Sequence, residues 1–174
     1  MPVDLDLIFD LSQAVRAQQA LSFQGQTDQL EFAECTFPEP LHYRLQVTPV
    51  EEQIWLSGEA KGLAVMECRR CLEPVTTPVT ARFQYLMEFH PEIEGIMQSE
   101  GAEELYWFGE LELDLSGLIA ESVFAALPLT VICQPQCQGL CPECGANLNH
   151  SHCEHPGHKA PSPLDELAHL FDEE

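Results

Sequence analysis

The sequence predicts an α+β domain in which an antiparallel β-sheet meander packs against one helix. Apolar and polar residues alternate in several short segments between residues 41 and 89, as expected of consecutive strands. An apolar stripe at helical spacing follows at residues 115–127, and close cysteine pairs lie near the strand ends and after the helix. The 174 residues, 45% of them hydrophobic, are enough to bury one core. We therefore expect a single domain over residues 1–160.

The strongest strand signal lies at residues 79–89, where every second side chain is apolar or aromatic. We expect turns at Glu51–Glu52 and at Lys61–Gly62, because charged residues and glycine interrupt the apolar pattern there. Weaker alternation predicts the other strands, at residues 3–9, 41–47, 54–56 and 63–66.

Three helices are expected. Ser12 should cap a short polar helix at residues 13–20, and Asp114 or Ser116 should cap the helix that Pro128 ends. A third, short helix with an acidic tail is expected over residues 161–174. Its shared apolar face holds Leu164, Leu167, Ala168 and Phe171.

The chain is strongly acidic, with 29 Asp and Glu residues against 7 Lys and Arg and a formal net charge of −22. Such a surface repels nucleic acid over most of its area and excludes a peripheral role on anionic membranes. Residues 91–109 are expected to form a solvated acidic loop, ended by an aromatic core strand at residues 106–108, with an exposed binding anchor as the alternative. The few basic residues cluster, and Arg69 and Arg70 are expected to be a solvated pair, with a small phosphate contact as the alternative.

Cysteine and histidine spacing indicates metal binding. The segment 133–155 contains Cys133-x3-Cys137-x3-Cys141-x2-Cys144 and Cys153-x-His155, and Cys68-x2-Cys71 precedes it. Pairs at this spacing supply adjacent corners of a tetrahedral zinc site, so eight ligands predict two zinc ions. Four protein ligands for each ion leave no open position, which makes the zinc structural and brings the net charge to about −25. Cys35 stands apart and is expected to be a small buried residue.

Three other readings of the cysteines are weaker. Disulfides need an oxidising compartment, and residues 1–7 resemble neither a signal peptide nor a membrane span, so a cytoplasmic location is expected. Cys137-x3-Cys141-x2-Cys144 matches the cysteine triplet of radical S-adenosylmethionine enzymes. In those enzymes the triplet stands at the start of a barrel of about 200 residues or more, and only 30 residues follow Cys144 here. A redox dithiol at Cys68 and Cys71 would need a following helix, and a turn into a strand follows instead.

Three stretches together resemble the YceD family, the large ribosomal RNA subunit accumulation proteins. They are Glu67-Cys-Arg-Arg-Cys-Leu72, the helix before Ala126-Leu-Pro128, and Cys137-Gln-Gly-Leu-Cys-Pro-Glu-Cys-Gly-Ala-Asn-Leu-Asn149. The resemblance implies a role in synthesis, processing or stability of large-subunit (23S) ribosomal RNA and implies no enzymatic activity. Many relatives have Cys-x-Cys where this chain has Cys153-Glu-His155, an exchange that keeps a zinc ligand.

The ligand pairs can be combined in two ways. Some members of the family lack the distal cysteines, which implies that Cys68, Cys71, Cys133 and Cys137 form one site and Cys141, Cys144, Cys153 and His155 the other. The distal four also close a compact loop on their own. The alternative joins the two Cys-x-x-Cys pairs as a zinc ribbon, and His150, His152 and His158 are spare histidines that could compete as ligands.

We therefore expect a non-catalytic ribosome-biogenesis factor held together by structural zinc. The alternatives are a metal-dependent RNA-processing enzyme and a zinc-stapled adaptor unrelated to the ribosome. The acidic surface predicts a basic ribosomal or ribosome-assembly protein as partner, with Glu92–Glu104 as the leading contact stretch. Ribosomal RNA would then be reached indirectly, with at most a minor contact through Arg69 and Arg70.

Overall fold

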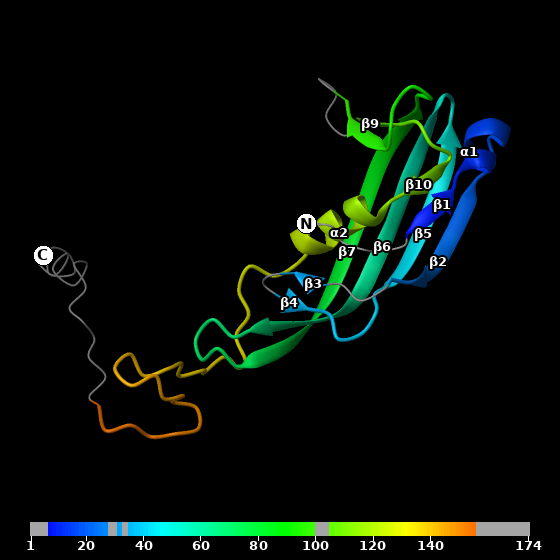
Figure 1. Cartoon of the computed structure of the whole chain (residues 1–174). Coiled ribbons are helices and arrows are strands. Elements are labelled where there is room, and N and C mark those ends of the chain that lie inside the picture. The colour runs from blue at the N-terminus through cyan, green and yellow to red at the C-terminus, as the bar shows by residue number, and fades with distance from the viewer. Residues whose placement is uncertain (1–6, 28–30, 33–34, 100–104, 156–174) are drawn as a thin grey trace, which may run out of the picture.

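Three long antiparallel strands form the centre of the molecule (Figure 1). They are β5 (His42–Val50), β6 (Gln53–Glu67) and β7 (Pro74–Phe89), joined by tight turns. The computed structural model describes residues 7–27, 31–32, 35–99 and 105–155. Within these residues the fold is mostly β-sheet with two helices, and the predicted meander is confirmed for these three strands.

The full sheet has the order β2-β5-β6-β7-β9-β8, and a small β3–β4 hairpin pairs with β6. The additional strands are β2 (Leu21–Gln26), β3 (Glu31–Phe32), β4 (Cys35–Thr36), β8 (Ile96–Gln98) and β9 (Leu105–Phe108). β9 pairs parallel to β7, so the expectation of a wholly antiparallel sheet is wrong. The reason is topological: β8 occupies the sheet edge, and β9 returns between β8 and β7.

The predicted turn at Lys61–Gly62 is also wrong, because β6 continues through it and pairs with β7 along its whole length. Gly62 points into the core, and a β-carbon there would overlap the side chain of Leu41, which is buried. Glycine is needed at this position for close approach of a core side chain, not for a turn. Strand β6 therefore carries the chain without a break from the Glu51–Glu52 turn to Cys68.

Both helices lie on one face of the sheet (Figure 1). Helix α1 (Ser12–Ala17) is shorter than predicted and Ser12 does not cap it. The carboxylate of Asp10 instead accepts a hydrogen bond from the Ser12 N–H at 2.8 Å. The carboxylate of Asp114 accepts from the Ser116 N–H in the same way at the start of α2 (Ser116–Ala125).

A two-stranded ribbon of β1 (Ile8–Asp10) and β10 (Glu112–Asp114) leads into the two helices. Of the predicted strand 3–9, residues 8 and 9 lie in β1, residue 7 does not, and residues 3–6 lie outside the described part. The core forms between this layer and the sheet, where alternate residues of β7 point inward as predicted. Helix α2 buries its stripe against the sheet, and Tyr85 of β7 hydrogen-bonds Ser122 at 2.7 Å.

The described parts of the acidic stretch, residues 91–99 and 105–109, are not all loop as predicted. They contain β8 as well as β9, and Phe108 of β9 is fully buried, which confirms the aromatic core strand. Cys35 is 4% exposed and lies in the core, as expected. The predicted C-terminal helix falls outside the described residues. Within those residues, no helix is long and apolar enough to cross a membrane.

Candidate metal centre

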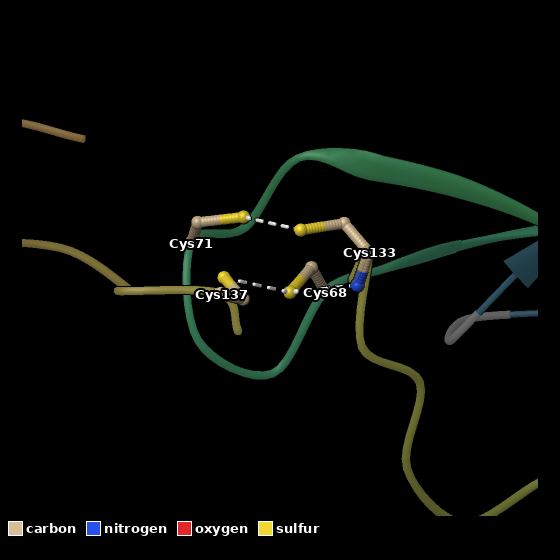
Figure 2. A group of neighbouring side chains, drawn as sticks. All are labelled: Cys68, Cys71, Cys133 and Cys137. Atoms are coloured by element: carbon tan, nitrogen blue, oxygen red, sulfur yellow. Dashed lines mark hydrogen bonds between the residues drawn. The ribbon is translucent and has the colours of Figure 1, made fainter. Parts of the chain in front are cut away.

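The hairpin between β6 and β7 presents Cys68 and Cys71, and we call residues 68–71 the first knuckle (Figure 2). The Cys68 N–H donates to the Glu73 carbonyl at 2.8 Å, and the Leu72 N–H donates to the Cys68 carbonyl at 2.9 Å. Leu72 has a φ of 61°, a left-handed conformation that closes the turn. The sulfur of Cys71 points toward Cys133 and that of Cys68 toward Cys137, and both cysteines of the knuckle are buried.

The segment after α2 runs past the tip of this hairpin. The Arg69 N–H donates to the Val131 carbonyl at 2.9 Å, a main-chain bond that joins the segment to the knuckle. Two residues later, the Cys133 N–H points at the sulfur of Cys68 at 3.4 Å. These contacts bring Cys133, and then Cys137, opposite the first knuckle.

The first group of ligands is Cys68, Cys71, Cys133 and Cys137, whose sulfur atoms all lie within 4.8 Å of one another. The Cys71–Cys133 sulfur distance is 3.6 Å and the Cys68–Cys137 distance is 3.8 Å. A tetrahedron of thiolates bound at about 2.3 Å from zinc has edges of about 3.8 Å. The spacing of the four sulfurs therefore fits a tetrahedral zinc ion.

Ionisation within the first group is uneven. Burial opposes the thiolate of Cys68, but N–H donors from Cys133, Arg70 and Cys71 outweigh it and lower the pKa to about 6. At Cys71, a bond from the Glu73 backbone favours the thiolate, yet burial and the neighbouring thiols raise the pKa to about 12. Four thiolates this close repel one another, and a divalent cation at their centre would allow all four to ionise.

The second knuckle, residues 141–155, is a compact loop. The Cys141 N–H donates to the Ala146 carbonyl at 2.8 Å, and the Gly145 N–H donates to the Cys141 carbonyl at 2.9 Å. Gly145 has a φ of 72°, a left-handed conformation that glycine adopts without steric cost, and it turns the backbone after Cys144. N–H donors from Cys144 and Glu143 lower the pKa of the Cys141 thiol to about 7.

The second group is Cys141, Cys144, Cys153 and His155, with ligand atoms again within 4.8 Å of one another. The structure thus brings the eight predicted residues together in the first of the two arrangements and not as a zinc ribbon. His150 and His152 belong to neither group, and His158 lies outside the described residues. That these residues bind metal stays a prediction.

The residues just before the second knuckle, 137–140, pack on the first knuckle. The Leu140 N–H donates to the Arg70 carbonyl at 3.0 Å, and the Arg70 guanidinium donates to the Cys137 carbonyl at 3.0 Å. His150 of the second knuckle lies 2.8 Å from the carboxylate of Glu73. Arg69 and Arg70 are both exposed, and the guanidinium of Arg70 is in addition held by its bond to the Cys137 carbonyl.

Sequence reasoning missed Asn149. Its side-chain N–H donates to the sulfur of Cys137 at 3.3 Å, and its oxygen accepts from the Gln138 N–H at 2.9 Å. The signal available was its place in the Asn147-Leu-Asn149 string, which carries two amides but indicates no partner. Hydrogen bonds to ligand atoms orient them and tune the affinity of a metal site.

Each group offers four candidate ligands, so a tetrahedral ion held by all four would have no open corner for water or substrate. A metal ion bound in this way would be structural. The first group joins the β6–β7 hairpin to the segment after α2, and the second closes its own loop.

Comparison with known proteins places the chain in a family. Residues 56–171, more than half of the chain, match the model of a protein family described as "Large ribosomal RNA subunit accumulation protein YceD". The chain belongs to the YceD family. The match begins within β6 and contains both candidate metal groups.

Relatives of this YceD family chain occur in bacteria and plants. An uncharacterized protein of Mycobacterium tuberculosis is 31% identical over 115 residues, covering 66% of this chain and 53% of that protein. The "Large ribosomal RNA subunit accumulation protein YCED homolog 1, chloroplastic" of Zea mays is 27% identical over 135 residues, which cover 63% of this chain and 46% of that protein. The protein of the same name from Arabidopsis thaliana is 25% identical over 139 residues, which cover 66% of this chain and 43% of that protein. The chain spans about half the length of the curated relatives it matches. No solved structure matches it.

Proposed function

We propose that this chain is a non-catalytic, cytoplasmic factor that supports synthesis, processing or stability of large-subunit ribosomal RNA. The observation that carries the proposal is that the chain belongs to a family whose members are described as large ribosomal RNA subunit accumulation proteins. The closed donor sets favour a structural over a catalytic role for the metal, because a metal-dependent RNA-processing enzyme needs an open coordination position.

Two zinc ions hold the candidate ribosome factor together in this proposal. Cysteine thiolates and imidazole are the ligands that zinc prefers, and the sulfur spacing of the first group suits its tetrahedral geometry. A reducing compartment such as the cytoplasm keeps these thiols available as ligands.

The chain acts on the RNA indirectly, through a basic ribosomal or assembly protein. A net charge of −22 repels phosphates, and Arg70 is already bound to the Cys137 carbonyl, which leaves Arg69 as the residue best placed for a minor RNA contact. Cationic proteins are the complementary partners for such a surface. Of the stretch Glu92–Glu104, Glu92 and Glu94 are described and exposed.

Affinity capture from cell extract with tagged full-length chain tests the proposal, in parallel samples with and without ribonuclease. Basic large-subunit proteins should remain bound after ribonuclease treatment and should dissociate as salt rises above about 0.15 M. Tight binding of the purified chain to naked large-subunit RNA at that salt concentration would contradict indirect action.

A matched pair of variants locates the contact. Glu92→Gln with Glu94→Gln should weaken capture of the basic partner, because both charges lie in the proposed contact stretch. Glu39→Gln with Glu121→Gln removes the same charge from exposed positions elsewhere and should leave capture nearly unchanged. Equal weakening by both pairs would assign the effect to net charge and not to this stretch.

A further inference from the structure

An open groove of about 1050 Å³ lies at the end of the sheet remote from the two knuckles (Figure 1). Its lining comes from the β8–β9 edge of the sheet, from β1 and β10, and from the start of α2. We call it the acidic groove, and its main lining residues are Ile8, Ile96, Tyr106, Glu110, Glu112 and Asp114.

Part of the lining is apolar. Ile8 is 60% exposed, and Phe89, Ile96, Tyr106 and Leu111 are half-buried. Phe89, Ile96 and Tyr106 also pack against the hydrophobic core, so the groove extends down to the core. An occupant that brings apolar side chains would therefore remove this surface from water, which favours binding.

Carboxylates line the groove along β10. Side chains alternate between the two faces of a strand, and Leu113 is buried, so Glu112 and Asp114 share the exposed face of β10. Their positions along the strand are about 7 Å apart. Glu110 is exposed as well and precedes Glu112 by two residues. The carboxylates are thus spaced far enough apart for each to meet a separate cation.

Of the described residues that line the groove, Arg16 of α1 is the one cation. It lies near Asp10, whose pKa is lowered by hydrogen bonds from Ser12 and by the charge of Arg16. Three carboxylates against one guanidinium leave the lining with an excess of negative charge. The groove therefore complements a cationic segment and repels an anionic one.

The turn at residues 91–95 adjoins the groove. Gly95 and Gly109 both line it, and a β-carbon at Gly109 would overlap the Ile93 carbonyl, so the turn and the end of β9 are in close contact. Glu92 and Glu94 lie in this turn and are exposed. The stretch proposed above as the partner contact is therefore continuous with the groove.

We propose that the acidic groove is the docking site of the basic partner and binds a segment in which Lys or Arg residues are interspersed with apolar ones. The apolar side chains of that segment cover Ile8, Ile96 and Tyr106. Its cations meet the carboxylates along β10. This inference rests on the basic partner proposed above and adds the place of contact and the kind of segment that fits it.

Photo-crosslinking of the full chain tests the docking. The probe p-benzoylphenylalanine replaces Ile8, and the chain is irradiated with the protein mixture extracted from large ribosomal subunits. Crosslinked peptides, sequenced by mass spectrometry, should be rich in Lys and Arg and contain apolar residues. The same probe in place of Leu63 is the control and should give few crosslinks. Leu63 is 44% exposed and follows the inward-facing Gly62, so it lies on the other face of the sheet.

The outcomes separate this inference from the proposed function. Basic proteins that crosslink from position 63 as much as from position 8, or from position 63 alone, would overturn the groove and leave the basic partner in place. Crosslinks from position 8 only to a second copy of this chain would also overturn it. Failure of every protein in the mixture to bind would contradict the basic ribosomal partner and this docking with it.

Neutralising the carboxylates provides the second readout. Glu110→Gln with Glu112→Gln should lower the affinity for the crosslinked protein by about 2–30-fold at low salt, the range for loss of two exposed ion pairs. Asp114 is left in place because its carboxylate accepts from the Ser116 N–H. Glu39→Gln with Glu67→Gln removes the same charge from exposed positions outside the groove and should leave the affinity nearly unchanged. Equal losses in the two double variants would contradict docking in the groove.

Discussion

The side-chain amide of Asn149 donates a hydrogen bond to the sulfur of Cys137 at 3.3 Å, so a residue of the second knuckle supports a ligand of the first group. Asn149 is itself held by the Gln138 N–H and by Asn147, whose side-chain oxygen accepts from it at 2.8 Å. The two candidate zinc sites are therefore separate in their ligands but connected through a hydrogen bond to one ligand.

Replacing Asn149 should weaken zinc binding at the first group. Asn149→Asp keeps the shape but removes the donor and places a negative charge beside a thiolate, so affinity should fall by about 10–100-fold. Asn149→Ala should have a smaller effect, because it removes the hydrogen bond without adding charge. Competition with a chromophoric chelator measures both, with His152→Ala as a control on an exposed residue outside the groups. Wild-type affinity in Asn149→Asp would contradict the role.

Native mass spectrometry should find two zinc ions on each chain. Cys68→Ser should lose one ion and much of the stability, because Cys68 and Cys133 join segments 65 residues apart and Cys68 is fully buried. Cys144→Ser should lose the other ion with a smaller fall in melting temperature, since its site closes only the loop 141–155. Bound iron, or disulfides in reduced extract, would contradict zinc. Equal destabilisation by the two variants would mean that the sites are not separable.

Gly62→Ala should lower the free energy of unfolding by about 1–3 kcal/mol, the usual cost of overpacking a core. The new β-carbon would overlap Leu41, which is 1% exposed and has little room to move. Gly117→Ala in α2 is the matched control: its β-carbon meets nothing within 4 Å. It should stabilise the chain by about 0.4–1 kcal/mol. Urea unfolding measures both, and a neutral Gly62→Ala would argue against the close approach.

Tyr85 should make stability depend on pH in the alkaline range. Burial raises the pKa of this phenol, which hydrogen-bonds Ser122 and the Leu118 carbonyl of α2. A pKa raised in the folded state adds stability below the unfolded value of about 10, and that contribution disappears as pH rises through the folded pKa. Absorbance titration near the phenolate band should show one tyrosine that ionises at a higher pH than a free phenol, and this step should be absent in Tyr85→Phe. Stability above pH 10 should fall less steeply in that variant.

The pattern of neighbouring residues was enough to predict several features of the fold and of the candidate site. The alternation along residues 79–89 correctly placed one face of β7 in the core, and the stripe of α2 is buried as predicted. The close spacing of each ligand pair is likewise a property of consecutive residues, so the sequence alone could nominate all eight. Local periodicity and turn geometry depend on neighbours in the chain, which is why these predictions needed no fold.

Features that depend on distant residues were beyond such reasoning. The pattern break at Gly62 resembled a turn because nothing local reveals that Leu41 packs there. The parallel pairing of β9 depends on β8 having taken the sheet edge first. Asn149 became recognisable only when the second knuckle folded against Cys137, 12 residues away in sequence. The sequence by itself determined which groups could bind metal; the tertiary structure decided which of them meet, because sheet register and main-chain bonds such as Arg69 to Val131 set their positions.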